Sequence, residues 1–278
     1  MTTPLNIRTP AISTSYGVNL ARKQRAIGLK QNSSNVLQLD VLGADGVPVD
    51  LAYGEYSRLA VRFREAVKRT SFTNEAAATL ITDSTVQATI PAQVVQSPGI
   101  FLAEVGVLDA DDHVLLTNEC YLFVENSAWG DSSQFGPPSI SEVRISLRDN
   151  DPIENELIVN YDFDLSELCA CAVRAVMDWN EQRPQLLLYD YDSRTFPMRN
   201  LWLQGTQLYL FMLAEEHYRR NHLPYSAGGI SLDDKNRHQL YSAAWKERQQ
   251  LWLANIRMQK ISMNIQGGWR YIGSRYPC

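Results

Sequence analysis

The side chains most able to do chemistry in this sequence are four histidines and four cysteines. The histidines are His113, His217, His222 and His238. His217 and His222 are five residues apart, so a helix turns them to different sides, and neither lies in an HExxH pattern. Cys169 and Cys171 are two apart on a predicted helix, which suits neither a disulfide nor a metal site. We therefore predict no metal centre and no cofactor site.

Acidic side chains gather in three places along the chain. They are Asp109, Asp111 and Asp112; Asp149, Asp151, Glu154 and Glu156; and Asp190 and Asp192. Carboxylates held about 5 to 9.5 Å apart can hydrolyse glycosides, and acidic clusters can bind calcium, although none here matches the EF-hand loop. Aspartates in turns more often accept hydrogen bonds from nearby amides. We predict no catalytic residue and no enzyme; a cell-wall hydrolase using Asp151 and Glu154 is an open alternative.

The composition is typical of a globular protein. Of the 278 residues, 45% are hydrophobic and 21% charged, and a length near 150 residues per domain suggests about two domains. No stretch approaches the roughly 20 apolar residues of a membrane helix, and the first residues lack the apolar core of a secretory signal. We therefore expect a reducing cytoplasm as the setting and no membrane partner.

Charge is distributed unevenly between the amino terminus and the rest of the chain. The whole chain has 26 basic and 31 acidic residues. Residues 1–34 contain five of the basic residues and no acidic one, so the remainder has a net charge of −10. We predict a basic arm over residues 1–17, which could bind nucleic acid or an acidic protein, or could simply be solvated.

The residues between positions 36 and 124 predict short β-strands. Leu59, Val61 and Phe63 alternate with other residues in the period of two that a half-buried strand shows. Apolar runs on both sides of Asp45-Gly46 predict a hairpin. Further strands are expected at 86–90, 101–108, 114–116 and 121–124. This pattern indicates an antiparallel, immunoglobulin-like β-sandwich over residues 18–126, without the Cys…Trp…Cys signature.

A linker over residues 127–139 separates the sandwich from a helical half, since glycine, serine and a proline pair interrupt regular structure there. Asp164 and Glu167 predict a capping box at the start of one helix. A second helix is expected from Pro197 to about Asn221. The chain is therefore predicted to be α+β, with two separate domains, the second an all-α bundle over residues 140–266.

The last predicted helix is long and carries a regular apolar seam. Residues 232–262 contain no proline or glycine, and a helix of this length extends about 46 Å. Its seam alternates spacings of four and three and is interrupted once by a glutamate. It consists of Leu240, Ala244, Glu247, Leu251, Ala254, Met258 and Ile261. We expect the seam to need another copy of the chain or a ring; coverage by its own chain is the alternative.

The carboxyl terminus, residues 267–278, is predicted to be an extended docking arm. Gly267-Gly268 would form a hinge, and Trp, Tyr and Arg are the residue types that contribute most to binding at interfaces. The predicted interface residues are Trp269, Arg270, Tyr271, Arg275 and Tyr276 in the arm, and Trp245 and Trp252 on the long helix. Alternatively the arm folds back on its own helices, and the two helix tryptophans, seven residues apart, pack within the chain.

Several strings of residues 140–278 resemble a domain of tailed-bacteriophage neck proteins, the head–tail connectors or adaptors. They are RDNDP at 148–152, DWN at 178–180, RRNHLPYSAGG at 219–229, DDK at 233–235 and NIQGG at 264–268. The amino-terminal half is similar, more weakly, to the β-sandwich that begins the upper baseplate proteins of some phages. That likeness rests on DGVPVDL at 45–51.

The resemblance implies a structural subunit of the virion neck or tail, assembled in the bacterial host cytoplasm. Connectors of this kind form homo-oligomeric rings, commonly twelve-fold, that dock under the portal protein and pass genome DNA without sequence-specific binding. A downstream tail or neck protein, or a fibre, would be a further partner, with the sandwich facing outward. The alternative is a baseplate or fibre-holding, host-adhesion protein. An acidic channel wall would repel phosphate and let DNA slide.

Overall fold

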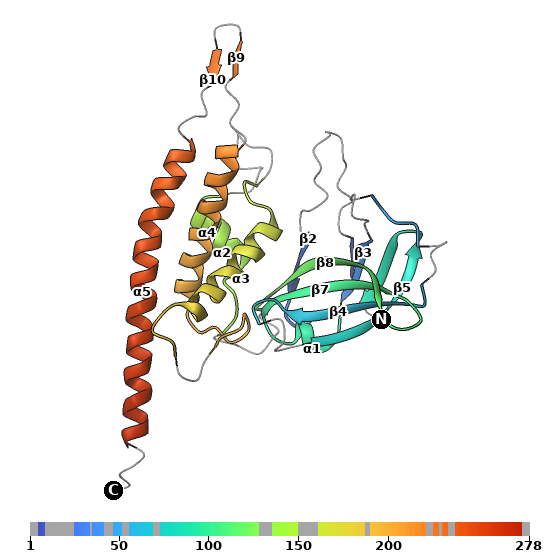
Figure 1. Cartoon of the computed structure of the whole chain (residues 1–278), viewed down its shortest axis with the longest axis horizontal. Coiled ribbons are helices and arrows are strands. Elements are labelled where there is room, and N and C mark those ends of the chain that lie inside the picture. The colour runs from blue at the N-terminus through green and yellow to red at the C-terminus, as the bar shows by residue number, and fades with distance from the viewer. Residues whose placement is uncertain are drawn as a thin grey trace. The chain divides into compact units, whose positions relative to one another are not determined.

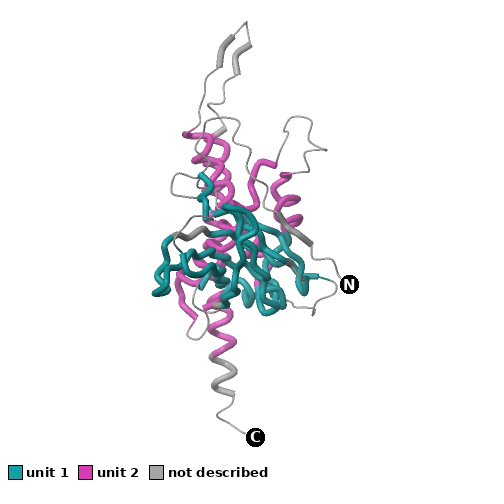
Figure 2. Tube along the Cα trace, turned by 90° about the vertical axis from the view of Figure 1, so that its right-hand side faces the viewer, with its two compact units in different colours: residues 1–139, 192–197 teal, residues 140–191, 198–278 magenta. Residues whose placement is uncertain are grey.

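The computed structural model of the chain contains two compact units (Figures 1 and 2). Unit 1 comprises residues 1–139 and 192–197, and unit 2 comprises residues 140–191 and 198–278. The structure describes residues 5–8, 25–33, 35–41, 47–51, 56–68, 73–127, 135–149, 161–186, 190–220, 225–227, 230–232 and 237–273. Strands dominate unit 1 and helices dominate unit 2, so the α+β division into a strand-rich and a helix-rich half is confirmed.

Unit 1 is built around an eight-stranded sheet in the order β1-β3-β6-β5-β4-β7-β8-β2. Its elements are β1 Leu5–Arg8, β2 Arg25–Lys30, β3 Asn35–Asp40, β4 Arg58–Glu65, β5 Thr73–Thr82, β6 Thr85–Thr89, α1 Ala92–Val95, β7 Gly99–Leu108 and β8 Val114–Glu125. The first half of β5 pairs with β4 and the second half pairs with β6. One strand therefore belongs to two groups of strands, and their apolar faces share one core.

The core of unit 1 follows the predicted alternation in β4. Leu59, Val61 and Phe63 are all buried and pack in the main apolar cluster with side chains from β3, β6, β7 and β8. The predicted strands at 86–90 and 101–108 correspond to β6 and β7. Burying one face of each strand supplies the apolar contact that stabilises the sheet.

Three predictions for unit 1 are corrected, and the predicted hairpin is described only in part. The apolar run at 36–42 corresponds to β3, which pairs with β1 and β6. The Val49 N–H donates to the Val41 carbonyl at 3.0 Å, and the Asp45-Gly46 turn between them lies outside the described residues. The two strands expected at 114–124 are one continuous strand, β8. Part of the predicted basic arm over residues 1–17 is sheet, since β1 pairs in parallel with β3. The sheet is also not wholly antiparallel, because β2 pairs in parallel with β8.

Unit 2 contains four helices and a short hairpin in its described part. These are α2 Ile140–Leu147, α3 Leu165–Glu181, α4 Arg199–Arg220 and α5 Arg237–Gly273, with β9 Tyr225–Ala227 antiparallel to β10 Ile230–Leu232. The sequence predicted the last three helices and missed α2, which is only eight residues long. The predicted capping box is confirmed: the Asp164 N–H donates to Glu167 Oε2 at 2.9 Å.

Helix α4 packs against both α3 and α5. At Gly205 the three helices approach so closely that an added Cβ would lie 2.6 Å from Trp252 Cζ2 and 2.8 Å from the Ala175 Cβ. Helix α5 has 37 residues and α4 has 22, which correspond to about 55 Å and 33 Å. The predicted helix bounds of 232–262 and the predicted hinge at Gly267-Gly268 are wrong, because α5 begins at Arg237 and continues through both glycines to Gly273.

Candidate interaction surface

The inner face of α5 is occupied by contacts within unit 2. Trp252 is only 3% exposed, and its indole N–H donates to the Leu201 carbonyl at 3.0 Å. Trp245 is half-buried and its indole N–H donates to Glu215. Both tryptophans therefore pack on α4, as the alternative of packing within the chain has it, because an indole ring combines a large apolar area with one hydrogen bond. Their role as interface residues stays a prediction.

Further polar contacts fix the inner face along its length. Arg248 Nη1 donates to Gln207 Oε1 at 2.9 Å, and its guanidinium lies 4.4 Å from the centre of the Phe211 ring. Near the end of α3, Lys260 is buried and its ammonium donates to the Gln182 carbonyl. Burial lowers the pKa of Lys260, while Asp190 acts in the opposite direction. These contacts hold α5 in one rotational setting.

That setting leaves the opposite face of α5 exposed. We call the outer stripe the set Leu240, Ala244, Glu247, Leu251, Ala254, Met258, Ile261 and Ile265. Leu240, Leu251 and Met258 are 70%, 61% and 66% exposed. Single exposed leucines are ordinary, but apolar side chains aligned along one helix face are typical of an interaction surface. The stripe contains the whole predicted seam and extends it by one position to Ile265.

The predicted tail residues are only partly placed. Trp269, Arg270 and Tyr271 lie in the last turns of α5, and their side chains are outside the described part of the structure. Arg275 and Tyr276 lie outside the described residues altogether. Their role in docking stays a prediction.

The three acidic clusters act mainly as local acceptors where the structure describes them. Asp109 accepts the N–H groups of Asp111 and His113 at 2.9 and 2.8 Å, and the backbone bond from His113 is the main cause that lowers the pKa of Asp109. Ligand atoms of Asp109, Asp111 and His113 lie within 4.8 Å of one another. Because this is an exposed turn, turn geometry explains the cluster without an ion.

The second acidic cluster begins with a buried ion pair. Asp149 pairs with Arg144 and also accepts the Asp162 N–H at 2.8 Å. The Arg144 guanidinium donates to the Phe163 carbonyl at 3.1 Å and lies 3.7 Å from the centre of the Tyr161 ring. This carboxylate joins two chain segments. Asp151, Glu154 and Glu156, on which the hydrolase alternative depends, lie outside the described residues.

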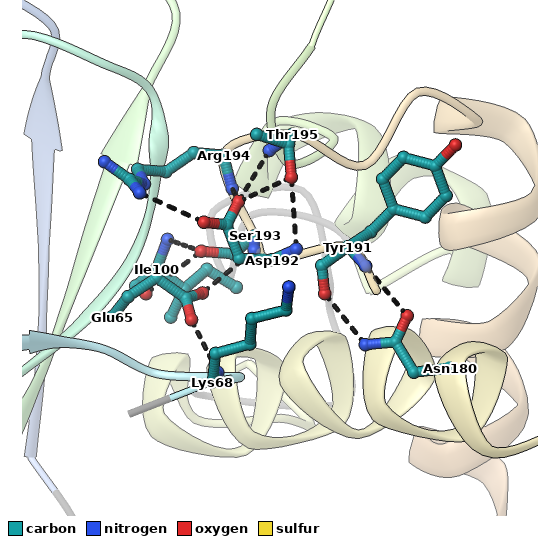
Figure 3. Close-up of polar contacts among 9 residues, drawn as sticks. All are labelled: Glu65, Lys68, Ile100, Asn180, Tyr191, Asp192, Ser193, Arg194 and Thr195. Carbon is teal, nitrogen blue, oxygen red and sulfur yellow. Dashed lines mark hydrogen bonds and ion pairs between the residues drawn. The ribbon is translucent and has the colours of Figure 1, made fainter. Parts of the chain in front are cut away.

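The third cluster starts a segment that the sequence analysis assigned to the helical domain. Residues 192–197 belong to unit 1, and we call them the clasp. The Ser193 hydroxyl accepts from the Ile100 N–H at 2.9 Å and donates to the Ile100 carbonyl at 3.1 Å. The Ser193 N–H donates to the buried Glu65 carboxylate at 2.9 Å (Figure 3). The clasp therefore supplies hydrogen-bond partners for the backbone of Ile100 in β7 and for the buried carboxylate of Glu65.

Hydrogen bonds to the Asp192 side chain hold the backbone of the clasp in a turn. One of its oxygens accepts from the N–H groups of Arg194 and Thr195 and from the Thr195 hydroxyl, at 2.7 to 3.0 Å (Figure 3). Burial acts to raise the pKa of Asp192, but the hydrogen bonds from Thr195 and the charge of Arg194 outweigh it and lower that pKa. An aspartate followed by serine and threonine is typical of such turns, so the turn was predictable although its docking was not.

Near the end of α4, Glu215 accepts the Trp245 indole N–H, and Arg219 and Arg220 both pair with Glu216. Cys171 is a buried free thiol whose pKa burial raises to about 12.

Comparisons with known proteins give a weak structural likeness and no family. No protein-family model and no curated protein sequence matches the chain. Among solved structures, the fibronectin(III)-like modules of Clostridium thermocellum CbhA match with a TM-score of 0.21 and 10% identity, over 37% of this chain and 91% of that one. No helix in the described part is both long and apolar enough to cross a membrane.

Proposed function

We propose that this protein is a structural subunit that works by assembly through the outer stripe of α5. The observation that carries the proposal is the contrast between the two faces of one helix. Trp252 and Ile256 are buried on α4, whereas Leu251 and Met258, one and two residues away, are 61% and 66% exposed. An uncovered apolar face costs free energy in water, about 25 cal/mol for each Å². A further protein surface that covers this face would remove that cost.

The assembly proposed for the chain is a head–tail connector ring in the neck of a tailed phage, docked under the portal around the DNA channel. Support comes from the likeness of the strings in residues 140–278 to neck adaptor proteins. The net charge of −10 outside residues 1–34 also suits a wall along which DNA slides. The proposal includes the immunoglobulin-like description of unit 1 and its outward use for decoration or fibre attachment, and it assigns no catalytic role.

A baseplate or fibre-holding subunit is the second candidate, with unit 1 as the binding module. Its support is the separate strand-rich unit, which has its own core. Sugar binding by this unit would call for a cluster of exposed aromatic rings. The exposed large hydrophobic side chains described in unit 1 are Val47, Ile81, Val114, Leu115 and Phe135. They are aliphatic with one exception, so we place this candidate second.

The position of the chain in a virion tests the proposal. Phage particles containing the chain with an affinity tag are labelled and imaged by electron microscopy. Label at the junction of head and tail is the expected result. Label at the distal end of the tail supports the baseplate candidate instead, and particles without the chain exclude both.

The stripe itself is tested by a matched pair of variants. Leu251→Glu places a charge in the outer stripe, whereas Gln249→Glu adds the same charge to an exposed position of α5 outside it. We expect incorporation into particles to fall about 100-fold in Leu251→Glu, since a carboxylate must then be buried, and to stay normal in Gln249→Glu. Equal incorporation of both variants would show that α5 is not the assembly surface. Circular dichroism confirms that both remain folded.

A further inference from the structure

The outer stripe of α5 has the same spacing when read from either end. From Leu240 to Ile265 its positions are separated alternately by four and three residues, starting and ending with four. The midpoint lies between Trp252 and Leu253. Two copies of α5 therefore bring every stripe position opposite another, whether they run parallel or antiparallel. The identities of the residues decide between the two arrangements.

The antiparallel arrangement matches large side chains with small ones. The opposed positions are Leu240 with Ile265, Ala244 with Ile261, Glu247 with Met258 and Leu251 with Ala254, and each of these layers occurs twice. Two of the four distinct layers place an alanine against a leucine or isoleucine. Such alternation fills the space between helices at the density of a protein interior.

The parallel, in-register arrangement is poor by the same criteria. It places Ala244 opposite Ala244 and Ala254 opposite Ala254, which leaves gaps beside layers of paired leucine and isoleucine. It also places Glu247 directly opposite Glu247 of the second copy, so two like charges meet at a partly dehydrated layer.

The antiparallel arrangement instead gives Glu247 a partner of opposite charge. Glu247 and Arg257 are both exposed, and neither takes part in an ion pair among the described residues of unit 2. On one helix they are about 15 Å apart, too far to pair. In an antiparallel copy, Arg257 is adjacent to Met258, the residue that faces Glu247. Two symmetric charge pairs therefore flank the interface.

We propose that, in the free protein, the outer stripe is covered by the same stripe of a second copy of this chain, antiparallel and related by a two-fold axis. In such a two-fold interface the same surface of both copies is used, so that if residue i of one copy contacts residue j of the other, j of the first also contacts i of the second. The contact is about 38 Å long and nearly four heptads, which is enough for a coiled coil. The inference rests on α5 alone and not on a virion role. A pair of this kind keeps the stripe covered until an assembly partner replaces the second copy.

Cysteine cross-linking distinguishes the arrangements. Ala244→Cys and Ile261→Cys are each made in the full chain carrying Cys278→Ser, and the chains are oxidised separately and as an equal mixture. A disulfide needs Cα atoms within about 7 Å. The expected result is a covalent dimer in the mixture and little in either variant alone. A covalent dimer from Ala244→Cys alone overturns the antiparallel pair.

Exchanging the charges of Glu247 and Arg257 tests whether these two residues pair between the copies. Sedimentation equilibrium measures the dimer dissociation constant of the wild type, Glu247→Arg, Arg257→Glu and the double variant. Each single variant is expected to weaken the dimer about tenfold, because it brings like charges together, and the double variant is expected to restore it. Gln249→Glu is the control and should not change the constant.

A monomer at all concentrations, or additive losses in the double variant, overturns the inference. Neither result affects the proposed function, which is judged by the position of the chain in particles. Conversely, a chain absent from virions that still forms the heterologous 244–261 cross-link leaves the antiparallel pair standing.

Discussion

The structural role of a side chain in this protein depends on its contacts more than on its residue type. Asp149 and Asp192 both belong to acidic clusters in the sequence, yet one is in an ion pair with Arg144 and the other closes a turn on Thr195. Trp252 is a typical interface residue by type, but it is buried on α4. In each case a hydrogen bond or ion pair within the chain satisfies the polar group, as a buried polar atom requires.

Asp192 makes the stability of unit 1 depend on pH. Its pKa is lower in the folded chain than in the unfolded chain, so its contribution is present above the unfolded value of about 3.9 and is lost as pH falls through the folded value. Asp192→Asn is expected to lower the free energy of unfolding by about 1 kcal/mol at pH 7. This difference should shrink in acid, as measured by urea unfolding at pH 7 and pH 3.

Asp111→Asn is the control for this experiment, since Asp111 is exposed in the turn between β7 and β8. We expect no change from it at either pH. A difference for Asp192→Asn that grows as pH falls would contradict the assignment.

At the scale of elements, the packing of α4 between two helices depends on the absence of one side chain. Gly205 lies in the middle of α4, where helix propensity alone disfavours glycine by about 1 kcal/mol relative to alanine. It is tolerated because Trp252 and Ala175 occupy the space that a Cβ would need. Gly267 is the opposite case, because an added Cβ there would meet only open space. Helix α5 nevertheless continues through it, since glycine permits a helix end but does not impose one.

Gly205→Ala and Gly267→Ala should therefore have opposite effects. The first should destabilise unit 2 by about 1 to 3 kcal/mol, because overpacking separates α4 from Trp252. The second should stabilise α5 by up to about 1 kcal/mol, because alanine is the better helix former. Thermal unfolding of the two variants and the wild type measures both. Stabilisation by Gly205→Ala would show that the three helices are less closely packed than described.

At the scale of the whole chain, the two units are not consecutive segments. The chain leaves unit 1 after Ser139, returns to it for the clasp, and then completes unit 2. In the clasp, the Ser193 hydroxyl accepts from the Ile100 N–H, and the Ser193 N–H donates to the buried Glu65 carboxylate. Gly99 accommodates it, since an added Cβ there would lie 2.8 Å from Arg194 Cγ. Unit 1 is thus completed by residues about 50 positions beyond its apparent end.

A fragment of residues 1–139 should consequently be less stable than unit 1 in the intact chain. Losing the hydrogen bonds of Ser193 removes about 2 to 4 kcal/mol. Hydrogen exchange of the β7 amides in the fragment and in the full chain measures the difference. Full-length Ser193→Ala is the matched control and should show an intermediate loss. Equal protection in all three would mean that the clasp does not stabilise the sheet.

The sequence by itself determined the local patterns: the alternation in β4, the capping box at Asp164, and the apolar seam of α5. These depend on residues within one or two turns of each other, so period and spacing are enough to read them. It did not determine which face of α5 is covered, because the seam and the face that contains Trp245 and Trp252 are both apolar. Only the packing of α5 on α4 decides which of the two is buried. Nor did the sequence place the clasp, where Ser193 meets Ile100 across 93 positions, since no local pattern encodes a contact that the folded chain creates.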